Sequence, residues 1–355
     1  MKIALLSGAY GNAGDSLIEF RAKNLLEEVF AGSAVDVISR KELGTRFEEI
    51  DGHDLIVFSG GPVYQQDISR NFDVSCAARL TKKIRIVGGG WKGYGRSQNL
   101  PYQYPFEERT YRFFEKVNAG HGLACRDWYS VKALKNAGLG NAVMTGCPAW
   151  YDPEFVHCLD IREAENAKPL ICISDPANPE NAPYILPLIR HVSECFPAAD
   201  IKLVLHRGRE TTDYERLAAS VREQGIAELA LLTPSAEAFS VYDRCNLHIG
   251  FRVHAHIYNL SRRHRSVLIE EDGRGAGVNE ALGLPALLAY NDELQLADRK
   301  VRKLLLKLRP EKNRFLLSQL DEYLDMLEKT GGVYFENAFR LMEQYYRQMQ
   351  AFLQQ

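Results

Sequence analysis

Short apolar runs alternate with helical patterns in the first half of the chain. Each run ends in glycine or polar residues, which is typical of buried strands followed by loops. The runs predict strands over residues 2–7, 35–39, 54–59, 84–88 and 122–126. A helix is predicted from about residue 16 to 30, where Ser16 and Glu19 form a capping-box pattern. Strands that alternate with helices indicate parallel strands joined by crossover helices.

The same alternation restarts after a charged, weakly patterned stretch at residues 160–168, which suits a linker. Strands are predicted over residues 170–174, 201–206, 229–232, 247–250, 266–269 and 286–289, and helices over 184–196, 212–224, 236–244, 254–262 and 278–282. Two successive doubly wound halves are the simplest architecture. Ligands of such folds bind at the carboxyl ends of the strands.

Helical patterning continues from about residue 292 to the end of the chain. The last stretch places apolar residues on one stripe: Phe335, Phe339, Met342, Tyr345 or Tyr346, Met349 and Phe352. Its polar face mixes acidic and basic residues, so it lacks the basic bias of a membrane-surface helix. We expect it to pack on the body of the protein or on a partner subunit. The predicted regions are two Rossmann-like α/β domains, 1–165 and 166–291, and a helical extension, 292–355.

The composition of the chain restricts its binding partners and its location in the cell. The net charge of −2 gives no bulk attraction to nucleic acid or to an anionic membrane surface. Seven cysteines are scattered without a C-x-x-C pair, which favours a reducing compartment. The first apolar run is too short for a signal peptide, and no stretch reaches the length of a membrane span. We expect a cytoplasmic protein; attachment to the inner membrane face and a homo-oligomer stay open.

Two glycine-rich motifs follow predicted strands. In the first, residues 8–16, three glycines at spacing three allow a tight turn close to a ligand. It does not match the dinucleotide fingerprint, and Asp15 suits sugar hydroxyls better than a phosphate. The alternative is an ordinary strand–helix turn with its own polar residues as caps. The second, residues 58–67, supplies Gln65 and other hydrogen-bonding groups suited to a carbohydrate, and a similar glycine run covers residues 87–95.

A third motif, residues 248–260, places Arg252 and His254 where a predicted strand meets a helix. Arg252 offers a rigid fork for a carboxylate or phosphate, and His254 can act as a general acid or base near neutral pH. His256 lies two residues further along the helix, so it points to another side and cannot share a metal ion with His254. We assign His256 to packing or to a backbone hydrogen bond.

Charged groups stand at two more predicted strand ends. Glu271, Asp272 and Arg274 occupy a glycine-containing loop, which either reaches a ligand of the third motif or is simply solvated. Arg126 and Asp127 stand where another strand meets a helix, and a structural ion pair is the default interpretation for them.

In this order the motifs resemble those of the polysaccharide pyruvyl transferase family. The similarity runs from residue 1 to about 290 and rests on the whole set rather than on one motif. The matching segments are Gly11–Asp15 for G-N-x-G-D, Gly60–Pro62 for G-G-G, Arg126–Ser130 for R-D-x-x-S, Gly250–Ala255 for G-x-R-x-H-A, and Glu271–Arg274 with Leu282–Pro285 for Y-D-x-K and L-G-L-P. The chain departs from the family at Pro62 and Arg274, and at Cys147, where the family usually has Asp.

The resemblance implies a fold like that of the B-type glycosyltransferases and transfer of pyruvate from phosphoenolpyruvate to a sugar as a ketal. Residues 1–165 then form the acceptor side and 166–291 the donor side. The resemblance implies donor binding by Arg126, Arg252 and Arg274, and catalysis by Arg252 and His254. The expected acceptor-binding residues are Gly11, Asn12, Asp15, Gly60, Gly61 and Gln65.

The same resemblance implies the partners of the protein. Phosphoenolpyruvate is the co-substrate, and no metal or other cofactor is implied. The acceptor is a sugar of a cell-surface or exopolysaccharide precursor, either lipid-linked or nucleotide-linked.

Two other functions stay open at this point. A nucleotide-sugar-dependent glycosyltransferase would use the same two domains, with Glu280 and the loop at Asp272 holding a ribose. Cations that converge on a small site favour phosphoenolpyruvate, whereas a base-binding slot favours the glycosyltransferase. The third option is a catalytically silent sugar-binding or scaffold protein, which is favoured if His254 is buried and turned away from the site.

Overall fold

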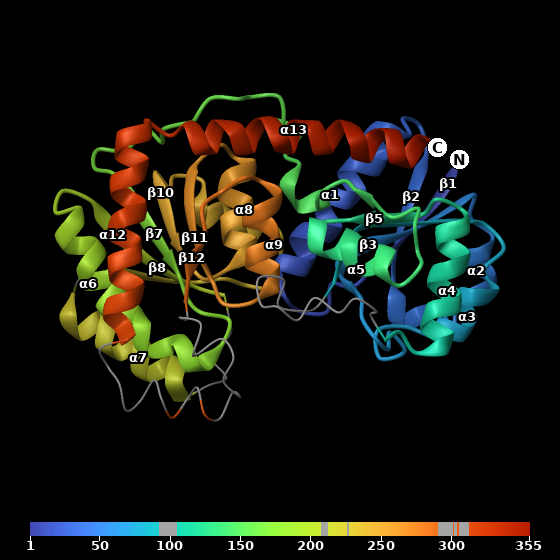
Figure 1. Cartoon of the computed structure of the whole chain (residues 1–355), viewed down its shortest axis with the longest axis horizontal. Helices are drawn as coiled ribbons and strands as arrows, with labels where there is room; N and C mark the ends of the chain where they lie inside the picture. The colour runs from blue at the N-terminus through green and yellow to red at the C-terminus, as the bar shows by residue number, and fades with distance from the viewer. Residues whose placement is uncertain (92–104, 207–211, 226, 290–300, 302–303, 305–311) are drawn as a thin grey trace. The chain divides into compact units, whose positions relative to one another are not determined.

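The chain folds as two compact α/β units, and its last elements are helices. The computed structural model describes residues 1–91, 105–206, 212–225, 227–289, 301, 304 and 312–355. Unit 1 comprises residues 1–157 and 340–355, and unit 2 comprises residues 158–339. Each unit is built on a parallel sheet (Figure 1). The predicted fold class, two Rossmann-like domains with a helical C-terminal extension, is confirmed.

Unit 1 contains a six-stranded parallel sheet in the order β2-β1-β3-β4-β5-β6. Its strands are β1 (Lys2–Ser7), β2 (Ala34–Ser39), β3 (Leu55–Tyr64), β4 (Lys83–Trp91), β5 (Leu123–Cys125) and β6 (Val143–Met144). Its helices are α1 (Ala13–Val29), α2 (Phe47–Asp51), α3 (Val74–Arg79), α4 (Glu108–Ala119) and α5 (Trp128–Asn136), with 3-10 turns η1 (Arg40–Glu42) and η2 (Pro148–Trp150). The short β6 has no counterpart in the predicted strands.

Unit 2 contains a second six-stranded parallel sheet, in the order β12-β11-β10-β7-β8-β9. Its strands are β7 (Leu170–Ser174), β8 (Asp200–Leu205), β9 (Glu228–Leu231), β10 (Leu247–Gly250), β11 (Arg265–Glu270) and β12 (Leu287–Leu288). Its helices are α6 (Ile185–Cys195), α7 (Thr212–Gln224), α8 (Val253–Ser261), α9 (Gly273–Ala281) and α12 (Lys312–Thr330), with 3-10 turns η3 (Pro179–Tyr184) and η4 (Glu237–Tyr242). Apolar side chains of β7, β8, β10 and β11 form its core with α6 and α12.

Both sheets reverse their strand order once. In unit 1 the reversal lies between β1 and β3, and in unit 2 between β7 and β10. At such a point the connections leave in opposite directions, which opens a crevice at the carboxyl ends of the strands where α/β proteins bind ligands. The strand order therefore marks one candidate ligand position in each unit.

The predicted linker at residues 160–168 is part of unit 2. The backbone N–H of Arg162 donates to the carbonyl of Arg263, and Glu163 forms an ion pair with Arg265. The amide of Asn166 donates to the carbonyl of Arg244. This segment is therefore packed on unit 2, because its polar groups pair with the strand and helix ends beside them.

Two predicted helix starts and one predicted helix type are wrong. Helix α1 begins at Ala13 rather than Ser16, because the Asn12 side chain accepts the Gly14 N–H and serves as the N-cap. Helix α9 begins at Gly273 with Asp272 as its cap, so the predicted glycine-containing loop is helical. The predicted helix over 236–244 is the shorter 3-10 turn η4.

The final helix, α13 (Val333–Gln354), begins in unit 2 and ends in unit 1. The whole predicted apolar stripe is buried. In unit 2, the Arg263 guanidinium lies 4.9 Å from the Phe339 ring centroid. In unit 1, Tyr345 contacts Trp150 and Tyr346 contacts Tyr151. The stripe thus packs on the body of the chain. Among the helices that the structure describes, none combines the length and the apolar content that crossing a bilayer requires.

A buried polar ladder joins the strands beneath the candidate position of unit 2. The His248 ring bonds to Ser266 Oγ at 2.7 Å and to Ser174 Oγ at 2.9 Å. The His256 ring bonds to the same Ser266 hydroxyl at 2.8 Å. Burial lowers the pKa of both rings, that of His256 to about 3, so they are neutral at pH 7. The ladder fixes Ser174 at the end of β7.

Replacing Ser266 by Ala removes the hydroxyl that both rings contact. A buried polar group that loses its partner is destabilising, so we expect Ser266→Ala to lower the free energy of unfolding by about 1–3 kcal/mol. Urea unfolding at pH 7.5 measures the loss. Ser220→Ala, on the half-buried face of α7, is the control and should change stability by less than about 0.5 kcal/mol. Equal losses in the two variants would contradict the role of the ladder.

The neutral histidines also make stability depend on pH. In the unfolded chain His256 binds a proton below about pH 6.5, whereas in the folded chain burial keeps its ring neutral until the pH approaches 3. The folded state therefore loses stability as the pH falls through this range. We expect the urea midpoint to be lower at pH 5 than at pH 7.5. His256→Gln should flatten this dependence by about 1.4 kcal/mol per pH unit. A slope unchanged in that variant would show that His256 is not buried in neutral form.

Candidate functional site

An ion pair occupies the reversal point of the unit 2 sheet. Arg252 is the N-cap residue of α8, directly after β10, and its backbone N–H donates to Ser174 Oγ at 3.1 Å. Its guanidinium Nε and Nη2 donate to the two oxygens of Asp175, at 2.8 and 2.6 Å. The two side chains are only 13% and 11% exposed. The fork of Arg252 is therefore fixed in orientation at the predicted strand end.

His206 completes this group from the end of β8. Its backbone N–H donates to Asp175 Oδ1 at 3.0 Å, and its ring Nε2 bonds to the Tyr242 hydroxyl at 2.7 Å. Burial, with the nearby charge of Arg252 and the His254 ring as further causes, lowers the pKa of His206 well below its usual value. The sequence analysis missed Asp175 and His206, although both lie at the carboxyl ends of predicted strands.

The two histidines of the third motif point to different sides of α8, as predicted. His254 is half-buried in the first turn of the helix, near enough to His206 to influence its pKa. His256 is fully buried in the ladder with Ser266. Its partner is a side chain rather than the backbone. Because His254 is not buried, the condition set for a silent scaffold protein is not met.

Glu271 is a buried carboxylate at the end of β11, not a solvated loop residue. It accepts hydrogen bonds from the backbone N–H groups of Ala177 and Asn178, at 2.7 and 3.1 Å, and from the side-chain amide of Asn181. Burial raises its pKa to about 7, against the opposing effect of those bonds. Glu271 thus holds the segment that follows Asp175.

Arg274 lies in the first turn of α9, the helix that follows β11, and β11 is the strand beside β10. Its Nε and Nη2 donate to the Asp272 carboxylate, with a shortest distance of 2.6 Å, and the same carboxylate caps α9. The side chain of Arg274 is half-exposed. Of the three predicted donor-binding cations, Arg252 and Arg274 therefore belong to neighbouring strand ends of one sheet.

Arg126, the third predicted cation, belongs to unit 1. It follows β5, is buried, and donates from Nε to Asp127 at 3.2 Å. Asp127 in turn caps α5 by accepting the Ser130 N–H. A Cβ on Gly90 would lie 2.2 Å from the Arg126 guanidinium. This close approach explains the glycine at position 90. Residues 92–95 of the predicted glycine run lie outside the described part of the chain.

A small pocket of about 160 Å³ occupies the reversal point of the unit 1 sheet. Of the predicted acceptor-binding residues, Asp15, Gly60 and Gly61 line it. Strand β3 continues through these glycines to Tyr64, so they lie within a strand rather than after one. Gly60 has a positive φ of 39°, and a Cβ there would come within 2.9 Å of Ile18.

The other predicted acceptor-binding residues have structural partners. The Asn12 side chain caps α1. The Gln65 amide donates to the Pro62 carbonyl of its own segment. Gly11 has a positive φ of 104° and supplies the turn before α1. In the described part of the chain, none of the three lines the pocket.

Arg40 is the residue of unit 1 that the sequence analysis missed. It follows β2 directly, lies in the wall of the pocket, and is only 5% exposed. Burial lowers its pKa to about 10, so the guanidinium is still charged at pH 7. The sequence contains one signal that could have identified Arg40: it is a basic residue immediately after a predicted strand.

Cys147 is a buried neutral thiol. Burial raises its pKa to about 11, and Arg126, Asp15 and Asp127 are all close enough to influence it. The family usually has a carboxylate at this position. This end of the sheet therefore carries one negative charge fewer than the motif pattern implies.

One side-chain group among the described residues has the composition of a metal site. His191 and Cys195 on α6 and Asp321 on α12 place one ligand atom each within 4.8 Å of one another. His191 Nε2 already pairs with Asp321 Oδ1 at 2.6 Å. Cys195 and Asp321 line a cavity with Ile171 and Leu247, at the amino-terminal edge of the sheet. The group is thus remote along the strands from Arg252.

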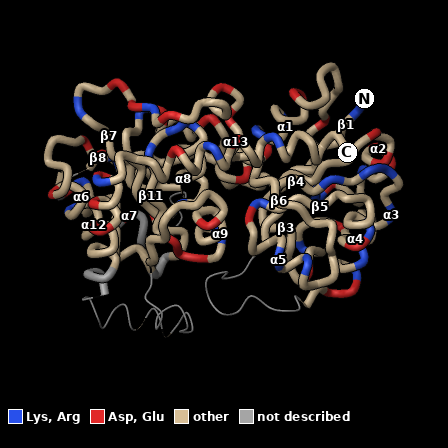
Figure 2. Tube along the Cα trace, turned by 45° about the horizontal axis from the view of Figure 1, so that its top comes forward, with Lys and Arg blue, Asp and Glu red and all other residues tan. Residues whose placement is uncertain are grey.

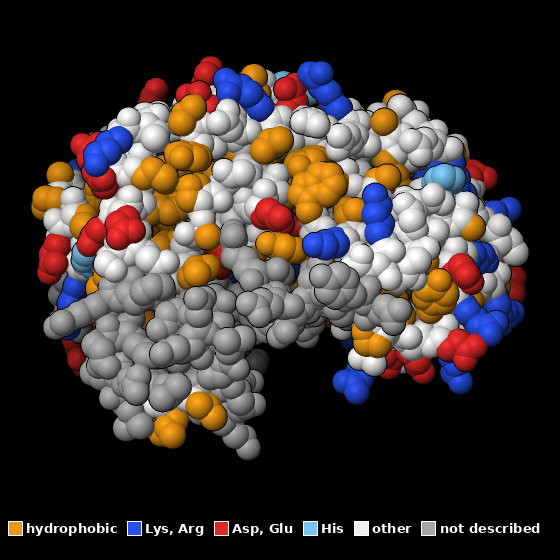
Figure 3. Space-filling view, in the orientation of Figure 1, with side chains coloured by type: hydrophobic (Ala, Val, Ile, Leu, Met, Phe, Trp, Pro, Cys, Tyr) orange, Lys and Arg blue, Asp and Glu red, His pale blue; other side chains and the backbone are white. Residues whose placement is uncertain are grey.

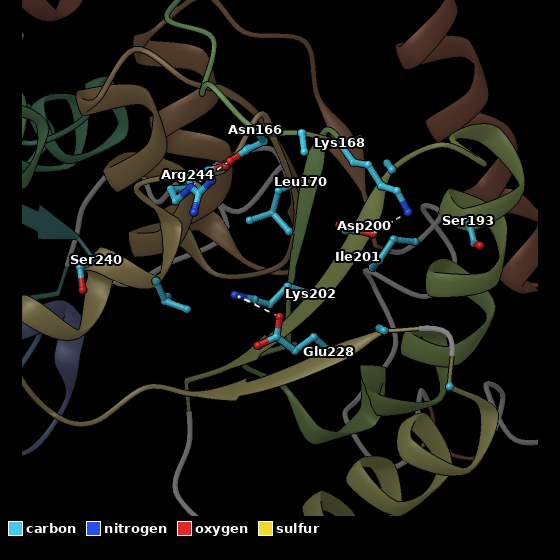
Figure 4. A pocket seen from close by; sticks show the side chains of 15 residues that line it. Asn166, Lys168, Leu170, Ser193, Asp200, Ile201, Lys202, Glu228, Ser240 and Arg244 are labelled. Carbon is cyan, nitrogen blue, oxygen red and sulfur yellow. Dashed lines mark hydrogen bonds and ion pairs between the residues drawn. The ribbon is translucent and has the colours of Figure 1, made fainter.

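A larger cavity of about 970 Å³ also lies at the amino-terminal edge of the unit 2 sheet. Figure 4 shows two ion pairs in its lining, Lys168 with Asp200 and Lys202 with Glu228, whose shortest distances are 3.8 and 3.3 Å. Its remaining cation, Arg244, donates to the side-chain oxygen of Asn166. α/β enzymes bind ligands at the opposite, carboxyl edge. We therefore place the candidate site at Arg252.

Acidic and basic side chains are mixed on the described surface. Figure 2 shows Lys and Arg interleaved with Asp and Glu along both units, and Figure 3 shows the same mixture on the face in view. The net charge is only −2. Any anionic ligand must therefore be held by locally placed cations.

The fold resembles that of solved structures with low sequence identity. UDP-GlcNAc 2-epimerase from Neisseria meningitidis, bound to UDP-GlcNAc, superposes with a TM-score of 0.54 at 11% identity and full coverage of both chains. The S. aureus MnaA–UDP complex superposes with a TM-score of 0.51 at 11% identity, covering 89% of this chain and 90% of that one. At this identity the likeness extends to the fold alone. Among curated proteins, no sequence matches this chain.

A family model described as polysaccharide pyruvyl transferase matches residues 12–260. The matched region includes Arg126, Arg252 and His254, and it ends before Glu271 and Arg274. It spans more than half of the chain and includes strands of both sheets. The chain therefore belongs to the polysaccharide pyruvyl transferase family and is an enzyme of that kind.

Proposed function

We propose that this enzyme transfers pyruvate from phosphoenolpyruvate to a sugar, forming a cyclic ketal and releasing phosphate. The observation that carries the proposal is the fixed guanidinium fork of Arg252 beside His254, in the first turn of α8 at the reversal point of the sheet. The expected acceptor is a sugar of a cell-surface or exopolysaccharide precursor. Unit 2 supplies the donor side and unit 1 the acceptor side.

Arg252 can bind the donor without losing its structural partner. Nε and Nη2 bond to Asp175, whereas Nη1 makes no hydrogen bond to any residue that the structure describes. Nη1 can therefore donate to the carboxylate or phosphate of phosphoenolpyruvate. The N-terminus of α8 adds a partial positive charge at the same place. Arg274, on the neighbouring strand end, and Arg126, in unit 1, are the further donor-binding cations of this proposal.

The reaction requires one proton to be added and two to be removed. His254, as imidazolium, donates a proton to the methylene carbon of phosphoenolpyruvate, which becomes the methyl group of the product. Two sugar hydroxyl oxygens form bonds to the adjacent carbon, and its bond to the phosphate oxygen breaks. Of the two hydroxyl protons, one returns to His254 and one leaves with phosphate. Cationic groups at the donor stabilise the charge on the departing phosphate.

Arg252 and His254 should fail in different ways when replaced. Arg252→Ala removes the fork and should abolish binding of phosphoenolpyruvate, measured by calorimetry on the intact chain. His254→Ala should retain that binding and lower acceptor-dependent phosphate release by about 10²–10⁴-fold. Arg222→Ala, an exposed arginine on α7, is the control and should keep both properties.

Two results would contradict the proposal. One is undiminished phosphate release in both site variants. The other is turnover of a nucleotide sugar in place of phosphoenolpyruvate with dependence on Arg252, which would identify the glycosyltransferase alternative. Circular dichroism melting shows whether each variant is folded.

Donor binding should also depend on Glu271. Above pH 7, where its folded-state pKa lies, Glu271 is ionised and its bonds to residues 177, 178 and 181 strengthen, which fixes Asp175 and hence Arg252. We expect the KM for phosphoenolpyruvate to fall between pH 6 and 8. Because the donor phosphate also titrates near pH 6, the comparison is with Glu271→Gln, in which the Glu271 contribution should be absent. Identical pH profiles for the two proteins would exclude this positioning role.

A further inference from the structure

The pocket of unit 1 is built around a buried arginine, Arg40, whose hydrogen bonds to described residues all go to backbone carbonyls. Arg40 Nε donates to the Leu6 carbonyl at 3.2 Å, and Nη2 donates to the carbonyls of Ser59 and Gly60, the latter at 2.9 Å. These carbonyls end β1 and lie within β3, the two strands of the reversal point. The guanidinium is thereby fixed in place by backbone atoms.

One end of the guanidinium is left for a ligand. Nη1 makes no hydrogen bond to any residue in the described part of the chain. It lies beside Gly8, where a Cβ would come within 3.2 Å of Nη1. Both residues line the pocket. A charged donor in this position gains from meeting an acceptor atom, because burial has removed most of its water.

The charges of the pocket favour an uncharged ligand. Asp15 also lines it and is close enough to raise the pKa of Arg40, so the lining residues include one cation and one anion. The start of α1 is not an open phosphate cradle. The N–H of Gly14 bonds to the Asn12 side chain, and the N–H groups of Asp15 and Ser16 bond to the Asn12 carbonyl. A phosphate would meet Asp15 without these donors.

The size of the pocket limits the ligand to one small group. Its volume is about 160 Å³, below the range of about 300–1,000 Å³ that is usual for drug-sized ligands. Tyr10 lines the pocket and is 45% exposed. Lys41 Nζ lies 4.2 Å from its ring centroid, so the part of the ring that Lys41 does not cover is available to a ligand. A donor, a carboxylate acceptor and an aromatic ring together suit the hydroxyls and the carbon framework of a sugar.

We infer that this pocket binds a single uncharged pyranose ring of the acceptor, with hydroxyl groups at Arg40 Nη1 and at the Asp15 carboxylate. This inference rests on the proposed function, since it names the acceptor group that the transferase recognises in unit 1. A phosphate or diphosphate that links the sugar to a carrier then lies outside the pocket.

Binding of simple glycosides to the full chain, without phosphoenolpyruvate, tests the inference. The probes are neutral methyl glycosides of glucose, galactose, mannose and N-acetylglucosamine, followed by saturation-transfer NMR. At least one should bind, and inorganic phosphate should not displace it. Gly8→Ala, which fills the space at Arg40 Nη1, should weaken binding by about tenfold or more through loss of a charged hydrogen bond.

Two further variants make the outcome specific. Asp15→Asn keeps the shape of the side chain and should also weaken glycoside binding. Gly140→Ala is the matched control, because a Cβ there meets nothing within 4 Å and its φ is not positive. It should bind as the unchanged chain does. Melting temperatures show whether each variant is folded.

The inference is overturned if no glycoside of the panel binds, if phosphate displaces the bound glycoside, or if both Gly8→Ala and Asp15→Asn bind normally. The donor result is separate, because phosphoenolpyruvate binding is measured on variants of unit 2. Turnover with phosphoenolpyruvate but without glycoside binding would remove only this inference. Glycoside binding without donor binding would remove only the proposed function.

Discussion

The ion pair between Asp175 and Arg252 joins the strand ends that form the candidate site of unit 2. Asp175 follows β7, accepts the backbone N–H of His206 at the end of β8, and accepts two bonds from Arg252 at the end of β10. Breaking a buried pair by removing one partner leaves an uncompensated charge, which typically costs about 3–5 kcal/mol. The same group is supported by Ser174, which the histidine ladder holds in place, and by Glu271, which binds the segment after Asp175.

The sequence pattern predicted the strands of unit 2 well and the partners of its charged groups poorly. Buried parallel strands appear as continuous apolar runs, so β7 and β10 were predicted with their observed limits. Helical geometry also separated His254 from His256. Asp175 and Arg252 are 77 positions apart, however, and meet only because β7 and β10 are neighbours. Strand order is a tertiary property that no local pattern contains.

Errors at element ends have a related cause. Ser16 and Glu19 fit a capping box, but Asn12 lies nearer the strand and its amide oxygen caps first, so α1 gains a turn. The sequence analysis missed Arg40, and it left Glu271 open between contact with a ligand and a solvated loop, because charged residues are usually exposed. Each is buried because backbone groups satisfy it: three carbonyls for Arg40, and two N–H groups for Glu271.

The return of the chain to unit 1 through α13 determines when that unit can be completed. Unit 2 is a continuous segment, whereas unit 1 has its aromatic cover, Tyr345, Tyr346 and Phe352, encoded after unit 2. During synthesis, domains generally fold as units from the N-terminus onward. Unit 2 is therefore the unit that can complete its folding first on the ribosome. Trp150 and Tyr151 of unit 1 lack their contacts with Tyr345 and Tyr346 until residues 340–355 have been synthesised.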